Sequence, residues 1–261
     1  MRTENGLRRA IENDETVFGA SAVTFSPTVI ETLGTVGLDF VWLDFEHGGP
    51  SPYDSTVFEE LTRAAEVADI ELLVRLPKPE PALVRKVLDA GVRTILLPRI
   101  ETAEQLQRAV EAAYFAYDGD VGDRGVGVGR SGNWEGYVDS FVGGEDSEVL
   151  VGTMIENRTA VENIEEILSV PQLGFAFLGP ADLSMSMSGG DPLAEHPDQL
   201  SAAIDRTREA CLDAGVPVGR IHNSVEEAQA AVDAGYRIVR IGSDMSAVRT
   251  TLGGRLDELQ G

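Results

Sequence analysis

Ionisable side chains follow several apolar, strand-like stretches of this 261-residue chain. They are Asp44, Glu46, His47, Arg75, Glu156 and Asp182. Placing such groups at the end of a buried run is costly unless they face a cavity or a ligand. In a (β/α)8 barrel, the catalytic residues lie at the C-terminal ends of several parallel strands. The pattern therefore predicts one active site assembled from four strand ends.

Two of these groups, Glu156 and Asp182, are carboxylates that each follow an apolar strand. Two carboxylates with open coordination positions suit a hard divalent ion such as Mg²⁺ or Mn²⁺. The alternative is helix capping or a salt bridge at the barrel rim. Gly179-Pro180 predicts a tight turn before Ala181 and Asp182, which leaves backbone N–H groups free for an anionic oxygen. This combination favours a metal site.

Asp44 and His47 form a second candidate pair. A carboxylate near a histidine fixes the tautomer and orientation of the ring and raises its basicity. Strand alternation puts Asp44 on the same face as Trp42 and Glu46. The alternative is a hydrogen bond at the rim, but the position at a strand end favours catalysis.

The remaining candidates for chemistry are arginines and lysines. Arg75 can clamp a carboxylate or stabilise an enolate oxygen, or it pairs with a neighbouring acid. Arg124 and Arg130 flank a glycine-rich stretch and are interpreted as solvated loop charges or as ligands for a second anionic group of the substrate. Neither of the two lysines, Lys78 and Lys86, ends an apolar strand. This argues against a Schiff-base lysine and for metal-assisted chemistry.

Other features limit the function classes. His196 and His222 are interpreted as solvent-facing or structural, and Cys211 as a small buried apolar residue. No G-x-G-x-x-G motif follows the first strand, so no nucleotide is expected. No apolar run is long enough to span a membrane and no signal core is present, which predicts a soluble, cytoplasmic protein.

The charge balance points away from nucleic acid and anionic membranes. There are 44 acidic and 21 basic residues, for a net charge of −23. Such a surface repels polyanions and keeps the protein soluble. Together with the scarcity of lysine, it also fits a halophilic protein from a high-salt cytoplasm.

Eight apolar strands alternate with helices, which predicts an α/β fold with a parallel sheet closed into a single (β/α)8 TIM barrel over residues 1–261. The strands are expected at 18–25, 40–44, 71–76, 94–98, 149–155, 174–178, 216–221 and 236–241. Helices are expected at 5–15, 27–33, 55–68, 79–90, 102–116, 157–168, 198–214, 224–234 and 245–259. Asp-Ala-Gly recurs at 89–91, 213–215 and 233–235, where glycine closes a helix. Residues 117–148 form a glycine-rich, acidic loop, and 184–197 are expected to be irregular.

In these motifs the chain resembles the HpcH/HpaI aldolases, which are metal-dependent class II pyruvate aldolases of the phosphoenolpyruvate/pyruvate barrel superfamily. The resemblance runs from about residue 17 to 252. It rests on Trp42-Leu-Asp-Phe-Glu-His47, Val74-Arg75, Leu88-Asp-Ala-Gly91, Leu97-Pro98, Arg124-Gly-Val-Gly127, Ile155-Glu156 and Leu178-Gly-Pro-Ala-Asp-Leu-Ser184.

The resemblance implies roles for these residues. Glu156 and Asp182 would bind Mg²⁺ or Mn²⁺, with Co²⁺ a further candidate. His47, oriented by Asp44, would be the base acting through a metal-linked water. Arg75 would hold the keto oxygen of pyruvate as it becomes an enolate. The backbone around Gly179, Ala181 and Asp182 would receive the carboxylate of pyruvate.

It also implies an assembly. Asp89 matches an aspartate that reaches the site of a neighbouring subunit. The family pattern is a homo-oligomer, a hexamer or trimer of dimers, with the last helix exchanged between subunits. The segment 124–134 is shorter and richer in glycine than usual, which affects the part of the site that selects the aldehyde.

The expected activity is reversible cleavage of a 4-hydroxy-2-oxo acid, a 2-keto-3-deoxy sugar acid or a related dicarboxylate, to pyruvate and an aldehyde. The first alternative is a lyase for malyl- or citramalyl-CoA-type thioesters on the related barrel. The second is a barrel without catalysis that serves as an assembly or ligand-sensing module.

Overall fold

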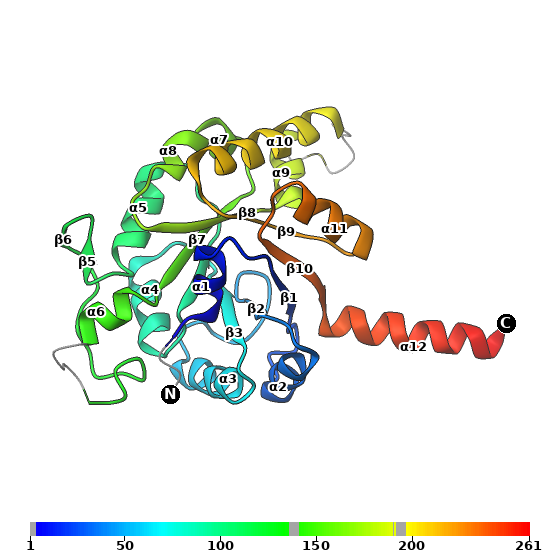
Figure 1. Ribbon diagram of the computed structural model, residues 1–261, viewed down its shortest axis with the longest axis horizontal. Coiled ribbons are helices and arrows are strands. Elements are labelled where there is room, and N and C mark those ends of the chain that lie inside the picture. Colours follow the sequence, from blue (N-terminus) through cyan, green and yellow to red (C-terminus); the bar gives the residue numbers. More distant parts are fainter. Residues whose placement is uncertain (1–3, 136–140, 190, 192–196) are drawn as a thin grey trace.

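The computed structural model describes residues 4–135, 141–189, 191 and 197–261. Eight parallel strands close into a barrel in the order β1-β10-β9-β8-β7-β4-β3-β2 (Figure 1). They are β1 (Val17–Ser21), β2 (Phe40–Asp44), β3 (Glu71–Arg75), β4 (Thr94–Leu97), β7 (Leu150–Ile155), β8 (Leu173–Leu178), β9 (Val218–Ile221) and β10 (Ile238–Ser243). The predicted (β/α)8 barrel is confirmed.

Helices cover the outside of the barrel. They are α2 (Pro27–Val36), α3 (Ser55–Val67), α4 (Pro81–Asp89), α5 (Ala103–Glu111), α7 (Arg158–Glu162), α8 (Ile164–Leu168), α9 (Pro180–Met187), α10 (Pro197–Ala214) and α11 (Val225–Asp233). The three glycines of the Asp-Ala-Gly repeats, Gly91, Gly215 and Gly235, adopt left-handed φ values of 98°, 68° and 97°. Glycine takes this conformation without strain, so the predicted helix ends are confirmed.

Two apolar layers result from strand alternation. One cluster fills the barrel interior and includes Phe40, Trp42, Phe175 and Phe177, while the larger cluster lies between strands and helices. Glycines make room for the interior rings: a Cβ at Gly152 would lie 2.2 Å from Phe175. Helix α1 (Gly6–Glu12) closes the N-terminal end of the barrel with Leu7 and Ile11, which belong to the interior cluster.

The predicted loops contain more structure than expected. Residues 117–148 include the end of a short hairpin, β5 (Ala116–Tyr117) with β6 (Asp120–Val121), and helix α6 (Phe141–Asp146). Helix α9 occupies the start of the segment expected to be irregular. The helix expected over 157–168 is interrupted at Asn163, whose side chain donates to the carbonyl of Glu101 at 2.8 Å.

The last helix, α12 (Asp244–Gln260), extends away from the barrel, shown in red in Figure 1. None of its residues is buried. Its N-terminus is fixed by a capping box between Ser243 and Ser246. No helix in the described part of the chain is long and apolar enough to cross a membrane.

Candidate active site

The predicted metal carboxylates lie at the C-terminal mouth of the barrel. Glu156 directly follows β7 and is 4% exposed. Its Oε1 accepts the backbone N–H of Arg99 at 2.7 Å, and its Oε2 has no hydrogen-bond partner among the described residues. Burial raises the pKa of Glu156; the Arg99 N–H and the Arg75 charge oppose this, while the charges of Glu46 and Asp182 raise it further. Glu156 is thus a buried carboxylate whose negative charge its surroundings compensate only in part.

Asp182 comes from the first turn of α9. The expected tight turn is instead a helix start, with Gly179 as the N-cap and Pro180 at the first position. The first helical bond runs from the N–H of Leu183 to the carbonyl of Gly179, which leaves the N–H groups of Ala181 and Asp182 without an acceptor within the helix. An anion at a helix N-terminus is stabilised by such groups and by the helix dipole.

The close approach of this helix to Glu156 requires glycine at position 179. An added Cβ would lie 2.8 Å from both the Glu156 Cβ and the Met154 Cε. Contacts this short do not occur without displacement of the neighbours. The glycine therefore lets the start of α9 lie directly beside Glu156.

Arg75 joins the acidic residues of the mouth. Its Nε and Nη2 donate to Oδ1 and Oδ2 of Asp44 at 3.0 and 2.5 Å, and Nη1 lies 3.1 Å from Glu46 Oε2 and 4.0 Å from Glu156 Oε2. Burial acts to raise the pKa of Asp44, but the hydrogen bonds and charge of Arg75 reverse this, and the net pKa lies below its ordinary value. One guanidinium thus compensates several carboxylates.

His47 lies beside Glu46 rather than beside Asp44. Its Nε2 is 3.7 Å from Glu46 Oε2, and its side chain is half exposed. From the Glu46–His47 segment, Asp44 accepts the backbone N–H groups of Glu46 and His47, at 3.0 and 3.3 Å. Because both Asp44 oxygens bind Arg75, the expected Asp44–His47 side-chain contact is absent from this arrangement, and Glu46 is the carboxylate next to the ring.

Sequence reasoning missed Arg99, which follows β4. Its Nε contacts Glu46 Oε1 at 2.6 Å while its N–H binds Glu156. Its φ of 56° lies in the left-handed region, which is unusual for arginine and marks strain held by the surroundings. The Leu-Pro-Arg segment gave no polar periodicity that could have indicated this role.

The donor set fits a divalent metal. Glu156 Oε2 and Glu46 Oε2 are buried oxygens without a hydrogen-bond partner in the described part of the chain. The described residues contain no group of three or more His, Cys, Asp or Glu arranged to hold a metal ion. Hard cations accept a few carboxylates and complete their coordination with substrate oxygens or water.

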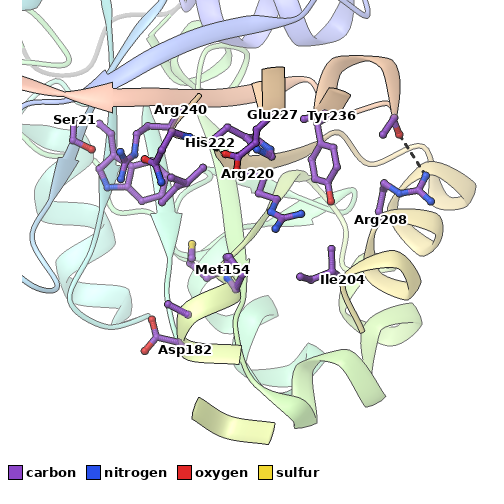
Figure 2. A pocket seen from close by; sticks show the side chains of 18 of the residues that line it. Ser21, Met154, Asp182, Ile204, Arg208, Arg220, His222, Glu227, Tyr236 and Arg240 are labelled. Atoms are coloured by element: carbon purple, nitrogen blue, oxygen red, sulfur yellow. Dashed lines mark hydrogen bonds between the residues drawn. The ribbon is translucent and has the colours of Figure 1, made fainter. Parts of the chain in front are cut away.

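The mouth opens into a cavity of about 760 Å³. Trp42 and Asp44 line this cavity, which agrees with the predicted strand alternation. Arg75, Gly179, Ala181 and Asp182 also line it. The cavity also has walls that the sequence did not indicate, formed by residues of β1, β9 and β10; these are Ser21, Arg220, Ile221, His222, Tyr236 and Arg240 (Figure 2).

The expectations for His222 and Cys211 have different outcomes. His222 is 8% exposed and lines the cavity, so a solvent-facing position is wrong; burial, and then the charge of Arg220, lower its pKa. Cys211 is fully buried, as expected, and burial raises the pKa of its thiol to about 12. His196 lies outside the described residues.

Asp89, Arg124 and Arg130 are not part of this mouth. Asp89 ends α4 just before β4 begins, which is the N-terminal side of the barrel. Arg124 pairs with Glu145 at 3.2 Å and Asp89 at 3.7 Å, and Arg130 binds both oxygens of Glu66. Both arginines are about 95% buried, so their interpretation as solvated loop charges is wrong.

The two lysines also lie elsewhere. Lys86, on α4, donates to Ser55 Oγ at 2.9 Å, and Lys78 pairs with Glu80 at 2.6 Å. Neither residue lines the cavity described above.

A (β/α)8 barrel whose C-terminal mouth joins carboxylates, an arginine and a helix N-terminus has the arrangement of a barrel enzyme with an anion-binding active site. A family model described as HpcH/HpaI aldolase/citrate lyase matches residues 19–251. The chain therefore belongs to the HpcH/HpaI aldolase/citrate lyase family, as the motifs predicted.

Individual relatives agree. The chain is 32% identical to a hydroxypyruvate/pyruvate aldolase of Roseobacter denitrificans, covering 95% of this chain and 94% of the relative. It is 31% identical to a 2-keto-3-deoxy-L-rhamnonate aldolase of Klebsiella pneumoniae, covering 97% and 92%. The crystal structure of a family protein from Burkholderia cenocepacia superimposes with a TM-score of 0.89 at 30% identity, covering 98% and 100%. Its relatives are thus aldolases, carbon–carbon lyases, which is the predicted enzyme class.

Proposed function

We propose that this protein is a divalent-metal-dependent class II aldolase that reversibly cleaves a 4-hydroxy-2-oxo acid to pyruvate and an aldehyde. The observation that carries the proposal is the incompletely compensated Glu156 carboxylate next to the cavity that Asp182, Arg75 and the start of α9 line. A Mg²⁺ or Mn²⁺ ion held by Glu156 and Asp182 would supply Lewis-acid polarisation of the 2-oxo group.

Two features of the protein would bind the 2-oxo acid half of the substrate. The free N–H groups of Ala181 and Asp182 would bind its carboxylate at the N-terminus of α9. Arg75 would donate to the 2-oxo oxygen from the Nη1 edge that faces Glu156. Because Asp44 fixes two other nitrogens of the guanidinium, the donor is preorganised for the negative charge that develops on this oxygen.

The proton chemistry would fall to His47. It would accept the proton of the C4 hydroxyl while the C4–O bond becomes the carbonyl of the aldehyde. The C3–C4 bond breaks, and its electron pair forms the enolate of pyruvate, which then takes a proton at C3. Glu46, 3.7 Å from the ring, would stabilise the protonated imidazole.

A coupled assay tests the proposal. Pyruvate release from a panel of 2-keto-3-deoxy acids and 4-hydroxy-2-oxo dicarboxylates would be followed with a salt-tolerant lactate dehydrogenase, with Mg²⁺ or Mn²⁺ and after EDTA. Release that depends on the metal is expected from at least one acid. No release from any acid, together with cleavage of a malyl- or citramalyl-CoA thioester, would replace the aldolase with the thioester lyase. Failure to bind any divalent ion would instead favour a barrel without catalysis.

We also infer that the protein is a homo-oligomer in which α12 packs on a second copy. Val248, Leu252 and Leu256 recur every four residues along one side of this helix, and each is more than half exposed. In a closed barrel the last helix ordinarily covers the outer face of the last and first strands. Here Phe18 of β1 and Ile241 of β10 remain 36% and 42% exposed. A hexamer with exchanged helices would cover both surfaces and would bring Asp89 to a neighbouring site.

Light scattering after size exclusion tests this assembly. The variant Leu252→Glu would place a charge within the apolar stripe and is expected to reduce the oligomer to smaller species. The control, Glu258→Gln, lies on the same helix and should keep the assembly. A wild-type monomer would contradict the inference.

The acidic surface supports a halophilic, cytoplasmic protein. At low ionic strength, the acidic side chains that give the chain its net charge of −23 repel one another, and salt screens this repulsion. Thermal unfolding in molar KCl should therefore occur at a higher temperature than in dilute buffer. A melting temperature independent of KCl would contradict this proposal.

A further inference from the structure

Arg240 is one of the cavity-wall arginines that have no assigned role. Arg240 lies on β10, where Ile238 belongs to the interior cluster and Val239 to the outer cluster. Strand alternation therefore directs Arg240 to the inside of the barrel, at its mouth. It lines the same cavity as Asp44, Arg75 and Asp182, and Figure 2 shows it on the wall near Ser21.

A β-bulge fixes the position of this side chain. Gly19 of β1 pairs with Arg240, but Ala20 pairs with Gly242, so Ile241 is an extra residue on β10. Bulges are enriched near active sites, where they redirect a side chain. Arg240 Nη1 donates to the carbonyl of Gly242 at 3.2 Å. Its Nε is buried without a hydrogen-bond partner among the described residues, so the guanidinium retains free donors.

The charge of Arg240 is compensated only in part, since burial and Arg75 lower its pKa by more than the charge of Asp44 raises it. Among the described residues, the three buried arginines each pair with a carboxylate: Arg75 with Asp44, Arg124 with Glu145 and Arg130 with Glu66. Arg240 forms no ion pair with any residue that the structure describes, although the chain has 44 acidic residues. Burial, and then the nearby charge of Arg75, lower the pKa of Arg240. A bound anion would offset both costs.

Its place in the barrel indicates which part of a substrate it meets. In the strand order, β9 and β8 separate β10 from β7, whose end carries Glu156, and β1 and β2 separate β10 from β3, whose end is Arg75. Arg240 thus lies across the barrel mouth from Glu156, near Arg75 and Asp44, whose charges affect its pKa. The aldehyde half of a bound 4-hydroxy-2-oxo acid would extend toward it.

We propose that Arg240, held by the bulge of β10, binds an anionic group on the aldehyde half and selects substrates with a second acid. A guanidinium matches a planar carboxylate through two parallel hydrogen bonds. The Ser21 hydroxyl on the adjacent strand lines the same cavity and adds a donor. The substrate class is therefore a 4-hydroxy-2-oxo dicarboxylate, whose aldehyde product is an oxo acid. This inference rests on the proposed aldolase function.

The test compares aldehydes in the synthesis direction. Pyruvate and Mn²⁺ would be combined with succinate semialdehyde, with uncharged butanal of similar length, or with glyceraldehyde 3-phosphate. The variants are Arg240→Met, which keeps an unbranched apolar side chain without the guanidinium, and Arg240→Lys, which keeps the charge. The control Arg206→Met removes an exposed arginine of α10 that pairs with Glu165.

Wild type should prefer the semialdehyde acid. Arg240→Met should lower kcat/KM for that acid by roughly 10- to 100-fold, the effect of losing a hydrogen bond to a charged group, and lower that for butanal by far less. Arg240→Lys should recover part of the loss. Preference for the phosphate would identify a phosphate group instead of the carboxylate. Equal losses for the acid and for butanal, or a wild-type preference for butanal, would overturn the proposal.

A binding measurement separates this inference from the aldolase proposal. Calorimetric titration with succinate, a non-reacting analogue, should give a larger dissociation constant for Arg240→Met than for wild type. If no aldehyde reacts but succinate binding depends on Arg240, the aldolase reaction fails while the anion site stands. If pyruvate chemistry is intact and succinate binds equally to both proteins, the anion site fails alone.

Discussion

Replacing Glu156 with Gln separates the metal role of this residue from its structural role. The substitution removes one charge and keeps the shape of the side chain. The amide oxygen can still accept the N–H of Arg99, which binds Oε1 at 2.7 Å in the wild type. The amide nitrogen brings two donors into a site where Glu46 Oε2, 3.1 Å from Arg75 Nη1, has no hydrogen-bond partner among the described residues. The metal-free variant should therefore be no less stable than wild type.

The change in melting temperature that Glu156→Gln causes relative to wild type should have opposite signs without and with metal. Satisfying a buried, unpaired acceptor is worth about 1 to 3 kcal/mol, and for a chain of this size each kcal/mol shifts the melting temperature by roughly 2 to 4 °C. A ligand at one hundred times its dissociation constant stabilises the folded state by about 2.7 kcal/mol. Wild type should thus gain roughly 5 to 10 °C with saturating Mn²⁺. The variant, which lacks an anionic ligand, should gain little.

Scanning calorimetry in EDTA and in Mn²⁺ checks both statements. The matched control is Glu162→Gln on α7, where the side chain is exposed and should leave the Mn²⁺ shift at its wild-type value. A Glu156→Gln protein with the full Mn²⁺ shift would refute the assignment of Glu156 as a ligand. A metal-free variant that melts well below wild type would refute the view that the charge of Glu156 is incompletely compensated.

The remaining predictions concern three other residues. Arg75→Lys should lower kcat/KM for pyruvate release by roughly 10²- to 10³-fold, because one ammonium cannot replace the fixed guanidinium donor. Arg75→Met should also destabilise the fold by about 3 to 5 kcal/mol in urea titrations, because it leaves buried carboxylates unpaired. Unchanged turnover of Arg75→Lys would contradict the proposed role of Arg75. Gly179→Ala should cost about 1 to 3 kcal/mol of stability and impair pyruvate release, since its Cβ would meet Glu156, while Gly125→Ala, with no atom near its added Cβ, serves as the control. The pKa of His222 is lowered in the folded state, so its contribution to stability is present above its ordinary value of 6.5 and is lost as the pH falls below it. His222→Gln should make the urea midpoint less sensitive to acid in that range, and equal sensitivity of both proteins would count against the burial argument.

Much of the fold was predictable because it depends on local rules. Strand alternation predicted that Trp42 and Asp44 face the interior, and the Asp-Ala-Gly repeats marked helix ends that the left-handed φ of Gly91 confirms. The boundaries of α9 were missed because Gly-Pro indicates a turn and a helix start equally well. The hairpin of β5 and β6 was missed because each strand has only two residues.

The amino-acid sequence by itself determined the barrel, the family and the set of strand ends that carry Asp44, Arg75, Glu156 and Asp182. These follow from periodicity and from motifs, which are properties of neighbouring residues. Only the tertiary structure decided how the charges pair: Asp44 with Arg75 rather than His47, and Glu46 with Arg99. It also revealed Arg240 as a cavity-lining cation that forms no ion pair with the residues that the structure describes. The physical reason is that ion pairing and desolvation depend on distances between strands far apart in the chain, which closure of the barrel alone sets.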